Sequence, residues 1–334
     1  MTLEAHVDEV AGETDFSGVV RVDRGDDLVF AKAYGLADRR WEIENTIATR
    51  FGVASGSKAL TALVVVGLVE SGELELGTTA RSVLGGDLPL IGDDVTVEHL
   101  LAHRSGIGDY LDEADGAGFE DYVLAVPVHE LATTEQYLAV LDGFPTKSPP
   151  DTEFAYNNGG YVVLALIAER VSGVAFAKLV EDRVCAPAGM HDTAFLRSDA
   201  LPDRTALGYV TIDGEDRTNV FHLPVRGTGD GGMFTTAADV VAFWRAFSGG
   251  RIVPAGWVAE MVRPRSVAAE SSMRYGLGFW LHESTDVVML EGCDAGVSFR
   301  TVHDPGSGLT HTVLSNTTDG AWPVTRMLDE RLGL

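Results

Sequence analysis

The stretch FGVASGSKALTALVVVGLVESGEL, residues 51–74, decides the fold of this chain because it predicts a helix that is apolar on every side. We expect that helix from about Ser57 to Ser71, with Gly72 ending it. Such a helix has no face for water and belongs in the middle of a domain. Lys58 lies at its start. Burying a lysine ammonium is costly unless the group is paired or loses its proton, so Lys58 requires a chemical explanation.

The bulk properties of the chain indicate a globular enzyme. Its 334 residues are enough for one large domain or two intertwined ones, and 45% apolar with 22% charged residues is ordinary for a globular protein. The formal net charge of −25 argues against nucleic acid and anionic membrane surfaces as partners. No apolar run is long enough to span a membrane, and the acidic start MTLEAHVDEVAGETDF does not resemble a signal peptide. We therefore expect a cytoplasmic protein.

No motif implies a metal or an organic cofactor. Cys185 and Cys293 lie far apart, and a cytoplasmic setting favours free thiols. His99 and His103 are four residues apart but lack a third ligand, so we interpret them as structural. Arg104 and Tyr110, near the Ser-Gly loop, are interpreted in the same way, with a place in the lining of the cleft as the alternative.

Strand patterns occur at both ends of the chain. A helix near Leu3–Val10 precedes two strands joined by a Gly-Asp turn, a hairpin signal. A helix at 324–333 ends the chain. The predicted strands lie at 17–25, 27–38, 275–283, 286–292, 297–305 and 309–316.

Helical periods fill the middle of the chain, at 96–106, 133–143, 160–173, 175–189 and 236–250. This order predicts an α+β fold, with one antiparallel sheet built from both chain ends, flanked by helices, and an inserted, mainly helical domain. The expected division is a sheet domain of residues 1–56 and 265–334 and a helical domain of residues 57–264. The active site is expected in the cleft between them.

Ser55 and Lys58 form the first chemical feature. Three residues apart at a helix start, they share one face, and the free N–H groups there suit an oxyanion. A lysine with a lowered pKa can take the proton of a serine hydroxyl and activate it as a nucleophile. The alternative is that Ser55 caps the helix and Lys58 lies at the surface. The apolar run behind the pair favours the functional interpretation.

Tyr156 and Asn158 form the second feature, in FAYNNGGYVVLALIAERVSG, residues 154–173. Tyr156 could relay a proton to a leaving group if a nearby lysine lowers its pKa. Asn158 could hold that lysine and a substrate amide. Alternatively, Asn157 or Asn158 caps the following helix and Tyr156 packs in the core.

S-x-x-K followed about a hundred residues later by Y-x-N resembles the penicillin-recognising serine hydrolases, which comprise serine β-lactamases, D-Ala-D-Ala carboxypeptidases and related esterases. The resemblance covers most of the chain and points to the class C-like branch, which also contains family VIII carboxylesterases and D-amino-acid-specific peptidases. The stretches that carry it are residues 34–63, TVEHLLAHRSGIGDY at 96–110, APAGMHDTAF at 186–195, GTGDGGMFTTAADVVAFWRAF at 227–247 and YGLGFWL at 275–281.

The resemblance implies a role for each residue of the two motifs. Ser55 is the acylated nucleophile, and its backbone N–H forms half of the oxyanion hole. Lys58 helps to deprotonate Ser55, and Tyr156 shuttles the proton to the leaving group. Asn158 orients Lys58 and the substrate.

The chain departs from the family at its third motif, which is Lys or His, a small residue and Gly. In VVMLEGCDAGVSFRTVHD, residues 287–304, Gly292 and Gly296 fix the alignment and place Leu290 at the cationic position. Glu291 takes the middle position, and the N–H of Cys293 would complete the oxyanion hole. Leu290 cannot attract a substrate carboxylate, and Glu291 would repel one.

Three cationic or titratable residues near this motif, His282, Arg300 and His303, could replace the missing cation in space. Cys293 is interpreted as a tolerated small residue rather than as a reactive thiol. We therefore expect a serine hydrolase that acts on a small ester, amide or peptide without a carboxylate. The alternatives are a β-lactamase or D-Ala-D-Ala carboxypeptidase, and a catalytically weak binding protein that retains the fold.

Overall fold

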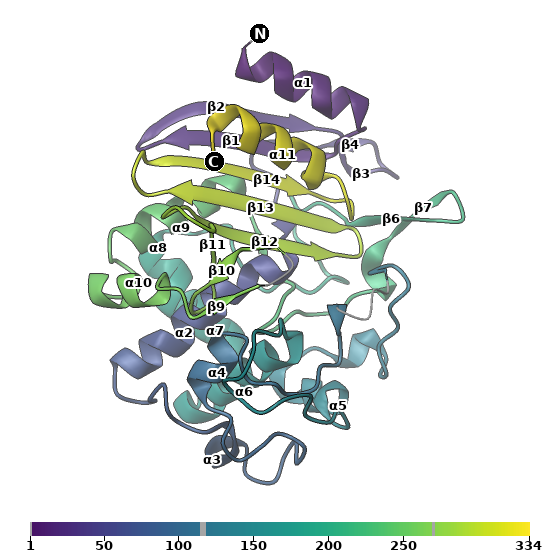
Figure 1. Cartoon of the computed structure of the whole chain (residues 1–334). Coiled ribbons are helices and arrows are strands. Elements are labelled where there is room, and N and C mark those ends of the chain that lie inside the picture. The colour runs from purple at the N-terminus through teal and green to yellow at the C-terminus, as the bar shows by residue number, and fades with distance from the viewer. Residues whose placement is uncertain (1, 114–117, 269–270) are drawn as a thin grey trace.

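The computed structural model describes residues 2–113, 118–268 and 271–334. Its centre is an antiparallel sheet of eight strands in the order β2-β1-β14-β13-β12-β11-β10-β9 (Figure 1). Strands from the two ends of the chain pair directly, with Gly18 opposite Ser315. This confirms the predicted sheet built from both chain ends. The strands are β1 (Gly18–Arg24), β2 (Asp27–Tyr34), β9 (Ser266–Val267), β10 (Arg274–Tyr275), β11 (Trp280–Leu281), β12 (Val288–Asp294), β13 (Val297–Asp304) and β14 (Leu309–Ser315).

Glycines explain where the strands agree with the sequence prediction and where they differ from it. Gly25 has a φ of +58° in the turn between β1 and β2, which is the predicted hairpin. The single strand predicted at 275–283 is instead two short strands, β10 and β11. The N–H of Gly276 donates to the carbonyl of Phe279, and Gly278 has a φ of +86°, so the chain turns back on itself.

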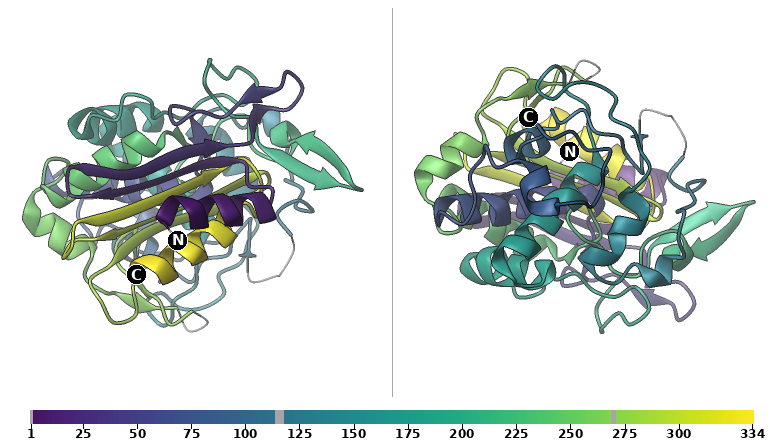
Figure 2. Two further views of the ribbon diagram at one scale, coloured as in Figure 1. Left: turned by 90° about the horizontal axis from the view of Figure 1, so that it is seen from above. Right: turned by 90° about the horizontal axis from the view of Figure 1, so that it is seen from below.

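Two terminal helices, α1 (Leu3–Glu13) and α11 (Ala321–Leu332), lie side by side over one face of the sheet (Figure 2). Both were predicted from the sequence. Their apolar sides meet the sheet in a compact core that contains Val7, Ala11, Val20, Val313, Val324 and Leu328.

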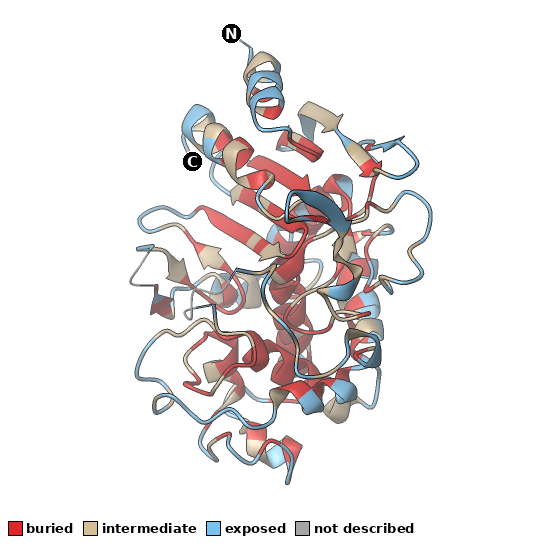
Figure 3. Ribbon diagram, turned by 90° about the vertical axis from the view of Figure 1, so that its right-hand side faces the viewer, coloured by how far each residue is buried: buried red, intermediate tan, exposed pale blue. Residues whose placement is uncertain are grey.

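The opposite face of the sheet is covered by helices that are largely buried. These are α2 (Lys58–Glu70), which continues a 3-10 turn, η1 (Ala54–Ser57), and α9 (Ala237–Ser248), while α6 (Asn158–Ser172) packs against α2. Burial is concentrated in the sheet and in the helices next to it (Figure 3). The sheet and these helices share one hydrophobic core, so the predicted division into two domains stays a prediction.

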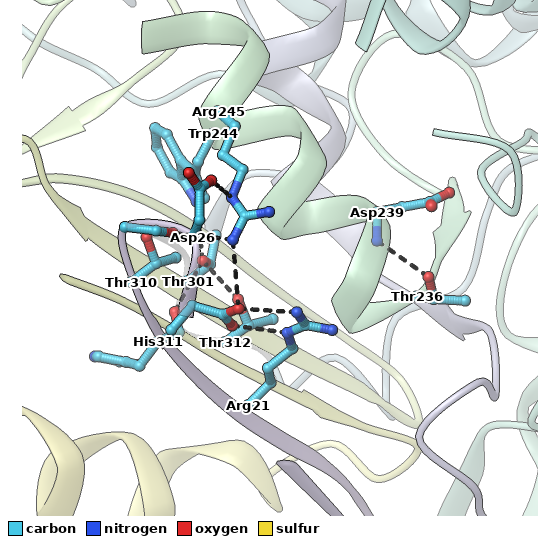
Figure 4. Close-up of polar contacts among 12 residues, drawn as sticks. Arg21, Asp26, Thr236, Asp239, Trp244, Arg245, Thr301, Thr310, His311 and Thr312 are labelled. Carbon is cyan, nitrogen blue, oxygen red and sulfur yellow. Dashed lines mark hydrogen bonds and ion pairs between the residues drawn. The ribbon is translucent and has the colours of Figure 1, made fainter. Parts of the chain in front are cut away.

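Polar side chains inside this core fix α9 on the sheet. The indole N–H of Trp244 donates to Thr301 Oγ1 at 3.0 Å, and Thr301 Oγ1 lies 2.9 Å from Thr312 Oγ1 on the neighbouring strand (Figure 4). The first turn of α9 is capped by Thr236, which accepts from the N–H of Asp239. Because buried polar groups need partners, these bonds select one position of the helix.

The remaining described elements are short. The helix predicted at 96–106 ends at Leu101, because His103 has a φ of +53°. None of the helices in the described ranges is long and apolar enough to span a bilayer. The short helices and turns are α3 (Ala80–Leu84), α4 (Val97–Leu101), η3 (Val128–Glu130), η4 (Thr134–Tyr137), α5 (Leu138–Leu141), α7 (Phe176–Val180), η5 (Glu181–Cys185), α8 (Ala186–Ala188), η6 (Asn219–Phe221) and α10 (Ala255–Met261).

Three further pairs of strands lie outside the main sheet. The hairpin of β6 and β7 projects from the body of the molecule and was not predicted (Figure 1). The pairs are β3 (Leu36–Asp38) with β4 (Ile43–Glu44), β5 (Phe51–Gly52) with β8 (Phe234–Thr235), and β6 (Tyr209–Ile212) with β7 (Glu215–Thr218).

Candidate active site

Ser55 lies on the 3-10 turn η1, between the edge of β5 and the buried helix α2. The residue before it, Ala54, has a φ of +43°, a conformation that residues with a Cβ rarely adopt and that is typical of functional turns. Ser55 is partly exposed, while Gly56 and Ser57 are buried. No side-chain cap precedes η1 or α2, so the alternative in which Ser55 caps the helix is wrong.

Lys58 is buried, with 2% of its surface exposed, and its amine has three hydrogen-bond acceptors. Lys58 Nζ lies 2.8 Å from Ser55 Oγ, 2.8 Å from Asn158 Oδ1 and 2.8 Å from the backbone carbonyl oxygen of Asp230. An ammonium has three hydrogens, so this arrangement satisfies all of them. The alternative in which Lys58 lies at the surface is therefore wrong.

The surroundings of Lys58 lower the pKa of its amine. Burial is the largest cause, because it disfavours the charged form. The carboxylates of Asp230 and Glu113 oppose this shift. A lysine whose pKa is lowered can hold a neutral amine nearer to neutral pH, which is the form that accepts a proton.

Asn158 lies where the sequence placed it, against Lys58, but its amide nitrogen is already occupied. Asn158 Nδ2 donates to the carbonyl of Leu111 and to Glu113 Oε1, each at 3.0 Å. An amide nitrogen has two hydrogens, so neither is free for a substrate in this arrangement. The geometry fits the expected role of Asn158 toward Lys58 and leaves no free N–H for a substrate.

The start of α6 is fixed by two side chains. Asn157 caps the helix by accepting from the N–H of Gly160 at 2.6 Å, as the alternative reading of this segment predicted. Asp109 accepts from the N–H groups of Asn158 at 2.5 Å and Gly159 at 2.8 Å. Burial raises the pKa of Asp109 to about 6. These bonds hold Asn158 in place against Lys58.

Tyr156 is partly buried beside Lys58, whose amine lies 4.9 Å from the centre of the tyrosine ring. The pKa of Tyr156 is raised well above its ordinary value, chiefly by burial and then by the Glu113 carboxylate, while a hydrogen bond with Ser55 opposes the rise. The condition considered from the sequence, that a nearby lysine lowers the pKa of Tyr156, is therefore not met. At neutral pH Tyr156 keeps its proton and can donate it.

The strand β12 passes directly beside the serine. A Cβ on Gly292 would lie 2.1 Å from the carbonyl oxygen of Val53 and 2.8 Å from the backbone nitrogen of Ser55. Only glycine fits such a close approach. Leu290 lies on the same face of β12, buried in the core shared with α2. The backbone of β12 at Gly292 therefore lies directly against the turn that carries Ser55.

Glu291 points to the other face of the sheet, because side chains alternate along a strand. It pairs with Arg300 on β13 at 3.6 Å, and Arg300 also contacts Asp329 of α11 at 3.5 Å. Glu291 does not line the pocket around Ser55. The expectation that Glu291 repels a substrate carboxylate is therefore wrong, because its side chain lies outside the pocket.

The proposed substitutes for the missing cation lie elsewhere in the structure. His282 accepts from the N–H groups of its own turn, and the ring of His303 stacks on Trp244. Neither of them lines the pocket. Cys293 Sγ lies 3.5 Å from the carbonyl of Thr318, and burial raises the pKa of its thiol, which opposes a reactive thiolate.

A pocket of about 1170 Å³, open to solvent, extends from Ser55. The charged side chains that line it are three carboxylates, Glu113, Asp230 and Asp294, and no lysine or arginine is found among its described lining residues. Burial, with the carboxylates of Asp230 and Glu113, raises the pKa of Asp294 to about 7. Much of the remaining wall is apolar and includes Leu124, Leu196, Leu201, Val220, Leu223 and Phe234.

The sequence did not identify these acidic residues as part of the site. The only signal for Asp230 was the glycine turn around it, since such turns mark close backbone contacts. A Cβ on Gly229 would lie 2.0 Å from the carbonyl of Tyr161, and the Gly229 carbonyl accepts from Thr61 Oγ1 at 2.6 Å. Tyr110 lines the pocket and donates to the Asp230 carboxylate, whereas Arg104 pairs with Asp151 outside it.

Comparisons with known proteins support this geometry. The family model described as Beta-lactamase matches residues 3–332. The crystal structure of a penicillin-binding protein from Bacillus halodurans has 35% sequence identity and a TM-score of 0.91, and the match covers 97% of this chain and 99% of that chain.

Two curated relatives have other activities in their names. Esterase EstB of Burkholderia gladioli is 31% identical over 214 residues, which is 62% of this chain and 54% of that protein. A D-aminopeptidase of Brucella anthropi is 28% identical over 274 residues, which is 80% of this chain and 49% of that protein. The chain spans between about half and five-eighths of the length of the curated relatives it matches.

Proposed function

This chain belongs to the beta-lactamase family, a family of serine hydrolases, and we propose that it cleaves an ester or amide without a carboxylate through an acyl-enzyme on Ser55. One observation carries the proposal. The buried amine of Lys58, with a lowered pKa, lies 2.8 Å from the hydroxyl oxygen of Ser55. A surface serine has no such base, and a binding protein has no need of one.

In the proposed acylation, the neutral amine of Lys58 accepts the proton of Ser55 as Oγ attacks the substrate carbonyl carbon. The negative charge on the carbonyl oxygen is stabilised by the backbone N–H groups of Ser55 and Cys293. Tyr156 donates its proton to the leaving group as the bond to that group breaks, and Tyr156 is reprotonated by the Lys58 ammonium. Water then hydrolyses the acyl-enzyme.

Two features support a substrate without a carboxylate. Leu290 lies at the position where the family's third motif has Lys or His, and its side chain is buried in the apolar core. The pocket itself contains the carboxylates of Glu113, Asp230 and Asp294. Like charges repel, so a substrate anion is disfavoured in this pocket, while a neutral group is not.

The apolar wall of the pocket supports a substrate with an apolar acyl or leaving group. Side chains such as Leu196, Leu223 and Phe234 line it within the same cavity as Ser55. Burying an apolar group against them is favourable by about 25 cal/mol per Å² of buried area. The names of the esterase and the D-aminopeptidase relatives are compatible with ester and amide substrates.

A second candidate is an enzyme or binding protein for penicillins. The observation that favours it is the 35% identity to a penicillin-binding protein over nearly the whole chain. The acidic pocket and Leu290 argue against it, because a penicillin carries a carboxylate.

Intact-protein mass spectrometry tests these proposals. The full chain and its Ser55→Ala variant are incubated with a fluorophosphonate and, separately, with a penicillin. A single phosphonate adduct that is absent from the variant, with no penicillin adduct, is the expected result. A penicillin adduct on Ser55 would favour the second candidate, and no adduct with either reagent would favour a binding protein without catalysis.

A further inference from the structure

We propose that His103 is a positioning residue that holds Tyr156 in place, an inference that rests on the proposed role of Tyr156 as proton donor. His103 bonds to the residues on both sides of the tyrosine. Its backbone carbonyl accepts from the N–H of Ala155 at 2.9 Å, and its Nδ1 accepts from the N–H of Asn157 at 3.1 Å. The backbone of Tyr156 is thus clamped by one residue from a distant segment.

The imidazole also packs against the tyrosine ring. His103 is 1% exposed, and its ring centre lies 4.4 Å from that of Tyr156 at a tilt of 36°. On its other sides it contacts the rings of Phe154, Tyr161 and Tyr275 at 5.8, 4.9 and 4.8 Å. A ring enclosed in this way cannot move aside, so the Tyr156 ring has a fixed wall behind it.

The hydrogen bonds select one protonation state of His103. Because the N–H of Asn157 donates to Nδ1, that nitrogen has no proton, and the proton of the neutral ring is on Nε2. His103 Nε2 is buried and has no hydrogen-bond partner in the described parts of the chain. Burial and the neighbouring Lys58 lower the pKa of His103 well below its ordinary value, which agrees with a permanently neutral ring.

This arrangement is unusual for a residue that only fills space. An apolar side chain would fill the same volume without leaving a buried N–H unpaired. His103 also adopts a φ of +53°, which directs both its carbonyl and its ring toward residues 155–157. The feature that an apolar residue could not supply is the acceptor at Nδ1, and that acceptor serves the segment of Tyr156.

The inference has a specific chemical consequence. A proton donor matters most when the leaving group is a strong base, such as an alkoxide or an amine. Nitrophenolate leaves without a proton, and the fluoride of a fluorophosphonate does so as well. Loosening Tyr156 should therefore slow the cleavage of alkyl esters and spare nitrophenyl esters, whereas general damage to the site should slow both.

The experiment compares kcat/KM for the 4-nitrophenyl and ethyl esters of one neutral acid, using the full chain. For His103→Ala we expect a loss of about 100-fold on the ethyl ester and of less than about threefold on the nitrophenyl ester. His103→Asn should recover most of the loss, because asparagine places an acceptor oxygen near the position of Nδ1 and tolerates a positive φ. His99→Ala is the matched control, since His99 caps α4 and bonds to Thr96 rather than to the tyrosine segment.

Equal losses on the two esters, or a His103→Asn variant as selective in its loss as His103→Ala, would overturn the inference. If His103→Ala does not fold, His103→Gln decides the matter, because its amide lies near the position of Nε2 and cannot reach the Asn157 N–H. It should show the same selective loss on the ethyl ester. The rate of phosphonate labelling, followed by mass, separates the two proposals. Wild-type protein without a Ser55 adduct contradicts the proposed function, whereas normal labelling with unselective ester losses contradicts only the role of His103.

Discussion

The buried amine nitrogen of Lys58 lies 2.8 Å from the hydroxyl oxygen of Ser55, which is partly exposed at the pocket. The two residues are one helical turn apart, and the same helix provides the apolar environment that lowers the pKa of the lysine. The carbonyl of Asp230 and the amide oxygen of Asn158 hold the amine in that position. The helix therefore both positions the base and activates it.

Replacement of Lys58 should abolish acylation. Lys58→Met keeps the length of the side chain and removes the base, and we expect kcat/KM for a nitrophenyl ester to fall by about 10³-fold. Lys58→Arg should be equally inactive, because a guanidinium does not give up its proton in proteins. Ester hydrolysis and labelling by a fluorophosphonate measure the loss, and an unchanged melting temperature shows that the fold is intact. Activity within tenfold of wild type in either variant would rule out Lys58 as the base.

The pH dependence of kcat/KM should follow Lys58. Only the neutral amine accepts a proton, so the rate should rise with pH through a midpoint below 10.5, the ordinary value for lysine, because burial lowers the pKa of Lys58. No fall in rate is expected up to pH 10, since the raised pKa of Tyr156 keeps its proton in place.

Asp294→Asn tests whether the rise of kcat/KM with pH belongs to Lys58. The carboxylate of Asp294 favours the charged form of Lys58, so its removal should move the midpoint to lower pH. The measurement is a pH series of kcat/KM with a neutral ester. A midpoint that moves to higher pH, or that stays unchanged in this variant, would assign the rise of kcat/KM with pH to another group.

Gly292→Ala should disable the site through backbone displacement. A Cβ there would lie 2.1 Å from the carbonyl oxygen of Val53 and 2.8 Å from the backbone nitrogen of Ser55. We expect kcat/KM to fall by at least about 100-fold, as when an oxyanion donor is lost. Gly12→Ala is the matched control, because a Cβ on Gly12 meets nothing within 4 Å and alanine favours its helix. Full activity of Gly292→Ala would show that β12 does not contribute to the oxyanion site.

Glu113→Gln should change the preference for substrate charge. Removing one carboxylate from the pocket should raise kcat/KM for an ester with an anionic acyl group about tenfold relative to its neutral analogue. The pair of substrates is a hemisuccinate and the matched neutral ester, compared at low salt. Glu9→Gln is the control, because Glu9 is exposed on helix α1 and its replacement makes the same change in net charge. An equal effect of the two variants would mean that overall charge, rather than Glu113, sets the preference.

The sequence predicted those features of the site that depend on neighbours along the chain. The apolar run from Ala59 to Val69 predicted a buried helix, and the spacing of Ser55 and Lys58 predicted that they share one face. The resemblance to a known family then implied roles for Tyr156 and Asn158, which the residues alone had left open. Two properties could not be predicted in this way. The direction of the Glu291 side chain depends on which face of the sheet it occupies, and the pKa of Tyr156 depends on its burial and on the charges nearby in space.

By itself, then, the sequence determined the α+β fold, the sheet from both chain ends and the serine-lysine pair, because periodicity and spacing are set by backbone geometry. Only the tertiary structure decided how that pair is surrounded. The acceptors that hold Lys58 come from residues 100 and 172 positions further along the chain. The acidic pocket, the strand beside Ser55 and the His103 clamp likewise join distant segments. Desolvation and charge act through space, so the packing of remote segments, rather than the order of residues, sets the chemistry of the site.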